Sequence, residues 1–183
     1  MAITRLNNNS ITSITALPSG CTSASGLSLG KVLKVSAKEY ADSSNTSSSS
    51  FVDAFDFTNI TPEAQNSKYL IQLMGGYIYC NPDKYMATRI SVKENNTGSY
   101  SAIQTANSRD WTTYHGDNSS YHTAPHSLSY LYTPTDTSTL TRLDFKVQFA
   151  SKNTSGSVAF NTSNYASSTL DGGITLSVME IGA

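Results

Sequence analysis

Seven consecutive residues towards the C-terminal end of the chain alternate strictly between apolar and polar side chains. In the run from Leu143 to Phe149 every odd position is apolar and every even position is polar. A period of two places all the apolar side chains on one face of a β-strand. The run therefore predicts a strand with one buried face, and such a face needs a second layer to cover it.

Other segments carry the same signal. Residues 31–37 place Leu33, Val35 and Ala37 on one side, and residues 173–178 follow a glycine-containing turn. No stretch of twelve residues carries an apolar stripe of helical period. We therefore expect an all-β chain, an antiparallel β-sandwich of jelly-roll type with roughly eight to ten short strands. Weaker strand candidates lie at 51–57, 87–93, 99–104, 127–132 and 157–161, and the Ser-rich run 41–50 is expected to be an exposed loop or a strand edge.

The strand expected at 68–74 carries apolar side chains on both faces. Tyr69 and Ile71 share one face, whereas Leu70 and Met74 share the other. A monomeric sandwich needs only one apolar face per strand, so this strand either contacts another subunit or lies centrally under a loop. The first alternative makes Tyr69, Leu70, Ile71 and Met74 candidate interface residues.

The last expected strand places a carboxylate on its core side. Continuing the alternation of Ile174, Leu176 and Val178 puts Glu180 on the same face. A buried, unpaired carboxylate is costly, so either a bulge intervenes or a partner holds Glu180. Glu180 therefore joins the candidate interface residues.

The first thirty residues are unlike the rest of the chain. Isolated aliphatic residues stand there among Asn, Ser and Thr, at spacings too irregular for a stable helix. We expect an N-terminal arm at 1–20, a linker at 21–30 and a sandwich domain at 31–183. The arm either extends freely or docks in extended form along another protein. The residues that would anchor it are Ile3, Leu6, Ile11, Ile14 and Leu17.

Composition excludes several classes of function. Only 14% of the residues are charged and the net charge is -1, so the chain has no basic footprint for nucleic acid. No apolar run is long enough to span a bilayer, and the first residues lack the apolar core of a secretory signal, so we expect synthesis in the cytosol and no membrane insertion. Cys21 and Cys80 are too few for a disulfide framework and are expected to be free thiols.

The three histidines cluster in one Tyr-rich segment, which raises the question of a metal site. His115, His122 and His126 are separated by 7 and 4 residues, with Gly116 and Pro125 between them. These two residues disfavour a helix that would align the histidines, and no Glu stands between them as in zinc proteases. We therefore expect neither a metal nor another cofactor.

A recognition loop fits the same segment better. Exposed Trp, Tyr and His side chains make large contacts at modest entropy cost and suit either glycan stacking or a protein interface. Alternatively the loop packs on its own sandwich. The candidate recognition residues are Trp111, Tyr114, His115, Tyr121 and His122.

Motifs of catalysis are not found. The chain has no Gly-x-Ser-x-Gly elbow and no phosphate-binding glycine loop. Asp53 and Asp56 are three residues apart, so on a regular strand they point to opposite faces and do not converge like the paired carboxylates of glycosidases. We expect surface groups there, and we do not expect an enzyme.

Short motifs follow one another in a distinctive order along nearly the whole chain. They are Asn7–Gly20, Gly30–Val35, Phe51–Asp53, Ile60–Pro62, Ser67–Ile71 and Ile174–Ile181. This order resembles a group of small virion proteins of tailed phages, of the capsid-decoration, head-fibre or tail-fibre type. The resemblance implies a trimeric jelly-roll domain. Residues 105–126 depart from the commoner pattern, which leaves any particular receptor open.

Together these observations lead to two hypotheses. The first is a bacteriophage virion structural protein on the particle surface: a homotrimeric decoration, cement or fibre protein that its arm attaches to capsid or tail proteins. The second is a receptor-binding module at a fibre tip that binds a host-surface glycan through the Tyr-rich and His-rich loop. The sequence does not distinguish a head location from a tail location.

Overall fold

Antiparallel β-strands form all the regular structure in the described part of the chain. The computed structural model describes residues 30–82, 85–103, 112–115, 122–152, 156–160 and 173–182. The strands are β1 (Val32–Tyr40), β2 (Ser44–Thr46), β3 (Val52–Ile60), β4 (Lys68–Gly75), β5 (Tyr77–Cys80), β6 (Tyr85–Glu94), β7 (Ser101–Ala102), β8 (Thr112–His115), β9 (His122–Pro125), β10 (Leu128–Tyr132), β11 (Leu143–Ser151), β12 (Val158–Phe160) and β13 (Ile174–Ile181).

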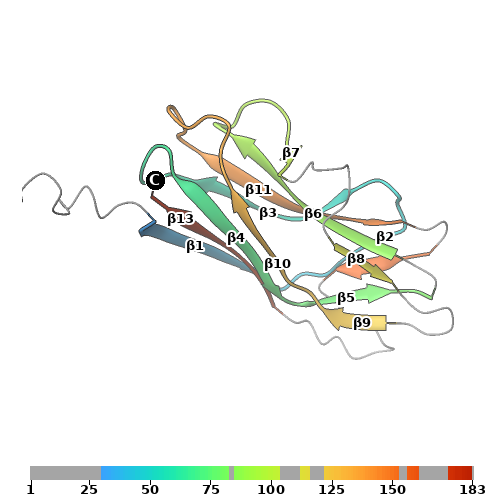
Figure 1. Ribbon diagram of the computed structural model, residues 1–183. Helices are drawn as coiled ribbons and strands as arrows, with labels where there is room; N and C mark the ends of the chain where they lie inside the picture. Colours follow the sequence, from blue (N-terminus) through green and yellow to red (C-terminus); the bar gives the residue numbers. More distant parts are fainter. Residues whose placement is uncertain are drawn as a thin grey trace, which may run out of the picture.

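Two sheets pack face to face as a sandwich, and the strand order is that of a jelly roll. The first sheet has the order β1-β13-β4-β10, and the second has the order β3-β11-β6-β7, with β8 also paired to β6. Figure 1 shows β1, β13, β4 and β10 side by side in one layer, with β3, β11 and β6 behind them. A smaller third sheet, β2-β12-β5-β9, continues the sandwich at one end. The predicted fold class, an antiparallel jelly-roll-like β-sandwich, is confirmed.

A glycine corner carries the chain from the first sheet into the third, between β4 and β5. Gly75 has a φ of +82°, a conformation that residues with a Cβ rarely adopt. A Cβ on Gly75 would also lie 2.7 Å from the backbone oxygen of Gly173, which immediately precedes β13. Glycine is therefore required here both by the turn and by the close approach of the two chain segments.

The core lies between the sheets, and β11 contributes its centre as the alternating pattern predicts. Leu143, Phe145, Val147 and Phe149 are all fully buried. Asp144 is an exception to the expected polar outer face, because it is fully buried although it points away from the core.

Neighbouring groups neutralise the buried carboxylate of Asp144. Its Oδ1 accepts hydrogen bonds from Arg142 Nε at 2.9 Å and from the backbone N–H of Asn59 at 2.8 Å. Lys93 Nζ lies 3.8 Å from Oδ2. A buried charge that is both paired and hydrogen-bonded is tolerated, whereas an unpaired one is not.

Val35 and Ala37, predicted to be buried on β1, are exposed. Val35 is 57% exposed, and Ala37 is exposed as well. A register shift between Val32 and Lys34 moves the alternation by one residue. As a result Lys34 faces the second sheet, where its Nζ donates to the backbone oxygen of Thr61 at 3.0 Å.

Asp53 and Asp56 lie on the same face of β3, whereas a regular strand would place them on opposite faces. The register between β3 and β11 shifts between Val147 and Gln148, which places Asp53 opposite Gln148 and Asp56 opposite Lys146. The extra residue of the bulge in β3 brings the two carboxylates to the same side of the strand. Both are exposed, as predicted for surface groups, and Lys146 donates a hydrogen bond to Asp53.

His126 is buried where the chain passes from the third sheet back into the first. It is 3% exposed, and its Nε2 lies 3.2 Å from the hydroxyl of Thr88. Its ring meets Phe160 edge to face, with 5.5 Å between the ring centroids. Burial lowers the pKa of His126 from 6.5 to about 4, because charging the imidazole in this site would cost its hydration.

We predict that His126 makes the fold sensitive to acid. Between pH 6.5 and pH 4 the unfolded chain binds a proton at this position and the folded chain does not, so stability falls as the pH decreases. The loss between pH 7 and pH 4 should reach about 3 kcal/mol. Urea unfolding at both pH values should show this loss in the unchanged chain and not in His126→Gln. Equal pH dependence in the two proteins would contradict the prediction.

Candidate functional site

An apolar row crosses the solvent side of the first sheet from one edge to the other. Val35 of β1 stands opposite Met179 of β13, and Met179 stands opposite Leu70 of β4. Leu70 in turn stands opposite Leu131 of β10. Directly opposed residues of neighbouring strands project on the same face, so these side chains form one continuous row over four strands.

Further apolar residues lie on the same side of the sheet. Val32 and Ile181 stand opposite each other beside one end of the row, and Met74 lies towards the other end, separated from Leu70 by Gln72. Of the six large hydrophobic residues that are exposed in the described part of the chain, four lie on this side: Val32, Val35, Met74 and Leu131. We name the outer face the set Val32, Val35, Leu70, Met74, Leu131, Met179 and Ile181.

The solvent side of the second sheet has the opposite character. Arg89 Nε donates to Gln148 Oε1 at 2.8 Å, and Gln148 Nε2 donates to Asp53 Oδ1 at 2.6 Å. The ammonium group of Lys146 lies 4.6 Å from the ring centroid of Tyr100. Although partial burial alone would raise it, hydrogen bonds from Lys146 and Gln148 hold the pKa of Asp53 below its usual value.

The two outer surfaces of the sandwich are therefore unequal. One carries a connected network of charges and hydrogen bonds, which is suited to contact with water. The other carries an exposed apolar row, and contiguous apolar surface of this kind marks sites of protein interaction. The outer face is the candidate functional site of the described residues.

Of the five residues predicted to form a subunit interface, Leu70 and Met74 lie on the outer face. Tyr69 and Ile71 are fully buried between the two sheets, so they support the fold of the chain itself and offer no surface to a partner. The second sheet covers one side of β4, and only the other side is open. Of the five residues, only Leu70 and Met74 therefore remain candidates for a subunit interface.

Glu180 lies on the core side of β13, as the alternation predicts, and the chain itself binds its carboxylate. It is 2% exposed. The backbone N–H groups of Glu63 and Ala64 donate to it at 2.8 and 2.9 Å. Burial and the charge of Glu180 raise the pKa of Tyr69, its neighbour across the strand pair. β13 itself alternates without a bulge up to Glu180, and no other subunit is needed to satisfy the carboxylate.

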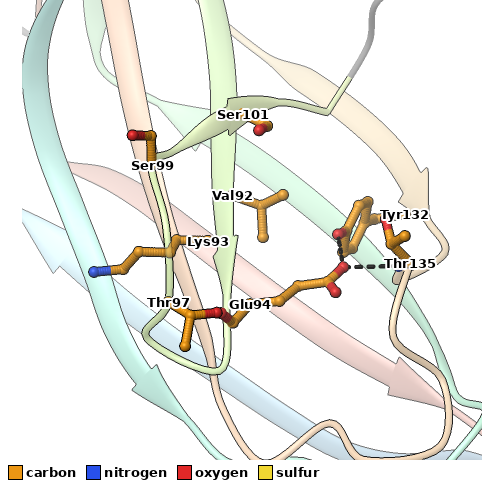
Figure 2. Close-up of a pocket in the computed structure, with 8 residues that line it drawn as sticks. All are labelled: Val92, Lys93, Glu94, Thr97, Ser99, Ser101, Tyr132 and Thr135. Carbon is orange, nitrogen blue, oxygen red and sulfur yellow. Dashed lines mark hydrogen bonds between the residues drawn. The ribbon is translucent and has the colours of Figure 1, made fainter.

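A shallow pocket beside β6 and β7 is a second place where polar groups gather. Glu94 lines this pocket, and Figure 2 shows its carboxylate directed towards Tyr132 and Thr135. The hydroxyl of Tyr132 and the backbone N–H of Thr135, at 2.8 Å, both donate to Glu94 Oε1. The backbone N–H of Asp136 donates to Oε2 at 2.9 Å. Glu94 thus holds the turn after β10 through three hydrogen bonds within the protein.

The predicted recognition residues lie only partly within the described residues. Trp111 and Tyr121 fall outside them. Tyr114 and His115 belong to β8, which pairs with β6, and His122 belongs to β9, which pairs with β5. Part of the expected loop therefore consists of strands, and its role in recognition remains a prediction.

Cys80 is a buried free thiol whose pKa burial raises to about 12, and Cys21 lies outside the described residues. Among the described residues no group of three or more His, Cys, Asp or Glu side chains is arranged to hold a metal ion. The described part of the chain contains no helix that could cross a membrane.

Among known proteins, solved structures match the chain, and they do so at low similarity. No protein-family model and no curated protein sequence matches the chain. The structure of the infectious bursal disease virus Gx strain has a TM-score of 0.36 and 13% identity, over 82% of this chain and 41% of that one. The VP2 subviral particle of the same virus has a TM-score of 0.35 and 16% identity, over 82% of this chain and 38% of that one.

A mutant VP2 protein that forms T=1 particles gives a TM-score of 0.35 and 13% identity, over 83% of this chain and 37% of that one. The chain thus spans about two fifths of the length of these viral chains. Similarity at this level leaves the function to be argued from the residues of the chain itself.

Proposed function

We propose that the chain is a structural subunit of a bacteriophage virion, a homotrimeric surface decoration, cement or fibre protein that packs against neighbouring copies through the outer face. The observation that carries the proposal is the contrast between the two sides of the sandwich. The row from Val35 through Met179 and Leu70 to Leu131 contains no charged residue, and the charged residues on the same side, Lys68 and Glu39, lie outside this row. Apolar surface without charge is characteristic of the buried centre of an interface between identical subunits.

The order of short motifs along the chain supports the assignment to a virion. It resembles that of small tailed-phage virion proteins, which implies a trimer on the particle surface. In this proposal the arm at 1–20 attaches the domain to capsid or tail proteins through Ile3, Leu6, Ile11, Ile14 and Leu17. Once a trimer has formed on the particle, its three arms hold it there together, because an arm that dissociates stays at high local concentration while the other two are bound.

A particle-binding experiment tests both parts of this proposal. Deletion of residues 1–20 should abolish incorporation, because the anchoring residues are lost, and the deleted protein should keep its circular dichroism spectrum. Leu131→Lys should lower the number of copies per particle at least several-fold, because it places a charge in the apolar row. Ser99→Lys is the matched control, since it adds the same charge at an exposed position off the outer face.

Quantitative mass spectrometry of purified particles provides the measurement. Full occupancy by the arm-deleted protein would exclude the arm as the attachment. Equal occupancy by Leu131→Lys and Ser99→Lys would exclude the outer face as a contact.

A carbohydrate-binding role at a fibre tip is the second candidate, and one observation favours it. Tyr77 and Tyr85 are 37% and 38% exposed. Tyr85 stands opposite His115 of β8, and Tyr77 stands opposite Pro125 of β9. Exposed aromatic residues thus stand opposite β8 and β9, the two strands that contain predicted recognition residues, and aromatic surface suits stacking on sugars.

A glycan array separates this candidate from the first. In the recognition role, the unchanged protein should bind defined glycans, and Trp111→Ala should reduce that binding at least tenfold while the fold is retained. Tyr77→Ala should weaken binding as well if the exposed tyrosines belong to the same surface. Absence of glycan binding by a protein that still occupies particles would reject this candidate and leave the structural role.

A further inference from the structure

We propose that residues 3–17 of the chain's own N-terminal arm cover the outer face until the protein is assembled. This inference rests on the proposed function, in which the outer face contacts neighbouring copies on the particle. Exposed contiguous apolar surface also promotes association at the wrong time and place. A segment of the same chain that occupies this surface would prevent premature association.

The chain enters the sandwich beside the outer face. The backbone N–H of Gly30 donates to the carbonyl oxygen of Gly182 at 2.9 Å, and the N–H of Gly182 donates to the carbonyl oxygen of Lys31 at 2.8 Å. These two bonds fix the start of β1 to the end of β13. Val32 and Ile181, the first residues of the outer face, stand opposite each other next to this point.

The segment between Leu17 and Gly30 is long enough to bring residues 3–17 onto any part of the outer face. Residues 18–29 number twelve, and twelve extended residues span up to about 40 Å. Neighbouring strands lie about 4.8 Å apart, so the four strands of the first sheet are roughly 15 Å across. A tethered segment also has a high local concentration, which favours the chain's own arm over the arm of another molecule.

The chemistry of the arm matches the outer face and not the other side of the sandwich. Arg5 is the only charged residue among the first 29, so the arm can lie on apolar surface with little loss of charge hydration. Its five scattered aliphatic side chains can pack along the row from Val35 to Leu131. The charged network around Lys146 and Asp53 on the second sheet offers these aliphatic groups no comparable surface.

Docking of this kind would couple attachment of the arm to the particle with association of neighbouring copies. When the arm binds the particle it leaves the outer face, which then becomes available to neighbouring copies. Association is then expected at the particle surface, where the arms are engaged, and not in the free protein. The same aliphatic residues thus serve two alternative contacts.

The four methionines of the chain provide probes of this contact. Met74 and Met179 belong to the outer face, Met86 lies in the core at 1% exposure, and Met1 lies at the start of the arm. The test compares methyl-methionine NMR spectra of the full chain, labelled with carbon-13, and of two arm variants. One variant replaces Leu6, Ile11, Ile14 and Leu17 with Ser, and the matched control replaces Asn7, Asn8, Asn9 and Thr12 with Ser.

Removal of the aliphatic groups should shift the signals of Met74 and Met179 and leave that of Met86 in place. The control variant should give the spectrum of the unchanged protein. The Met179 signal of the full chain should not change on tenfold dilution, because the contact lies within one molecule. Unchanged Met74 and Met179 signals in the aliphatic variant would overturn the inference, and so would a dilution-dependent Met179 signal, which would indicate the arm of another copy.

Sedimentation velocity distinguishes failure of this inference from failure of the proposed function. The aliphatic variant should associate with increasing concentration, and addition of Leu131→Lys to it should abolish that association. A variant that shows shifted methionine signals but remains monomeric would leave arm docking intact and count against the outer face as a subunit contact. A variant that associates but shows unshifted methionine signals would count against arm docking and would leave the outer face as a subunit contact.

Discussion

The pairing of the C-terminal strand β13 with both β1 and β4 is the constraint on which the rest of the structure depends. β13 pairs along its whole length with both neighbours, so it lies in the interior of the first sheet. It follows β4 by about 100 residues in the sequence. Without it the first sheet would separate into β1 on one side and the pair β4–β10 on the other. Pairing over such a sequence distance is costly in loop entropy, so the first sheet is expected to form late in folding.

The position of β13 inside the first sheet determines what the side chains on each of its two faces contact. Leu176 and Val178 are buried against the second sheet, and Glu180 continues on the same side, where the segment after β3 supplies its hydrogen-bond donors. On the opposite side Met179 joins Val35 to Leu70 and completes the apolar row. The buried carboxylate and the outer face are thus two results of one strand insertion.

Local patterns in the sequence predict the strands well where one face is apolar. The alternation at 143–149 corresponds to β11, and the candidates at 51–57, 87–93 and 127–132 overlap β3, β6 and β10. The strands β5, β8 and β9 were not predicted, because they are short and lie next to glycine or within the Tyr-rich and His-rich segment. Their pairing partners belong to distant parts of the chain, and periodicity carries no information about partners.

Where sequence analysis failed, the cause is a bulge or a long-range contact. A single shift after Val32 exchanged the two faces of β1 and exposed Val35, and a bulge in β3 brought Asp53 and Asp56 to one side. The two-sided pattern of 68–74 correctly indicated that apolar side chains lie on both faces of β4. It could not show that Tyr69 and Ile71 are the inner set, because that depends on which side the second sheet covers.

In the proposed assembly, the outer face is buried against other protein on the particle. Methionine oxidation measures this directly, because the thioether reacts with peroxide only where solvent reaches it. In assembled particles Met74 and Met179 should react as slowly as Met86, which is buried in the core. In the free protein that lacks residues 1–20 they should react much faster than Met86. Rates for Met74 and Met179 in particles that equal those of the free, arm-deleted protein would contradict the account.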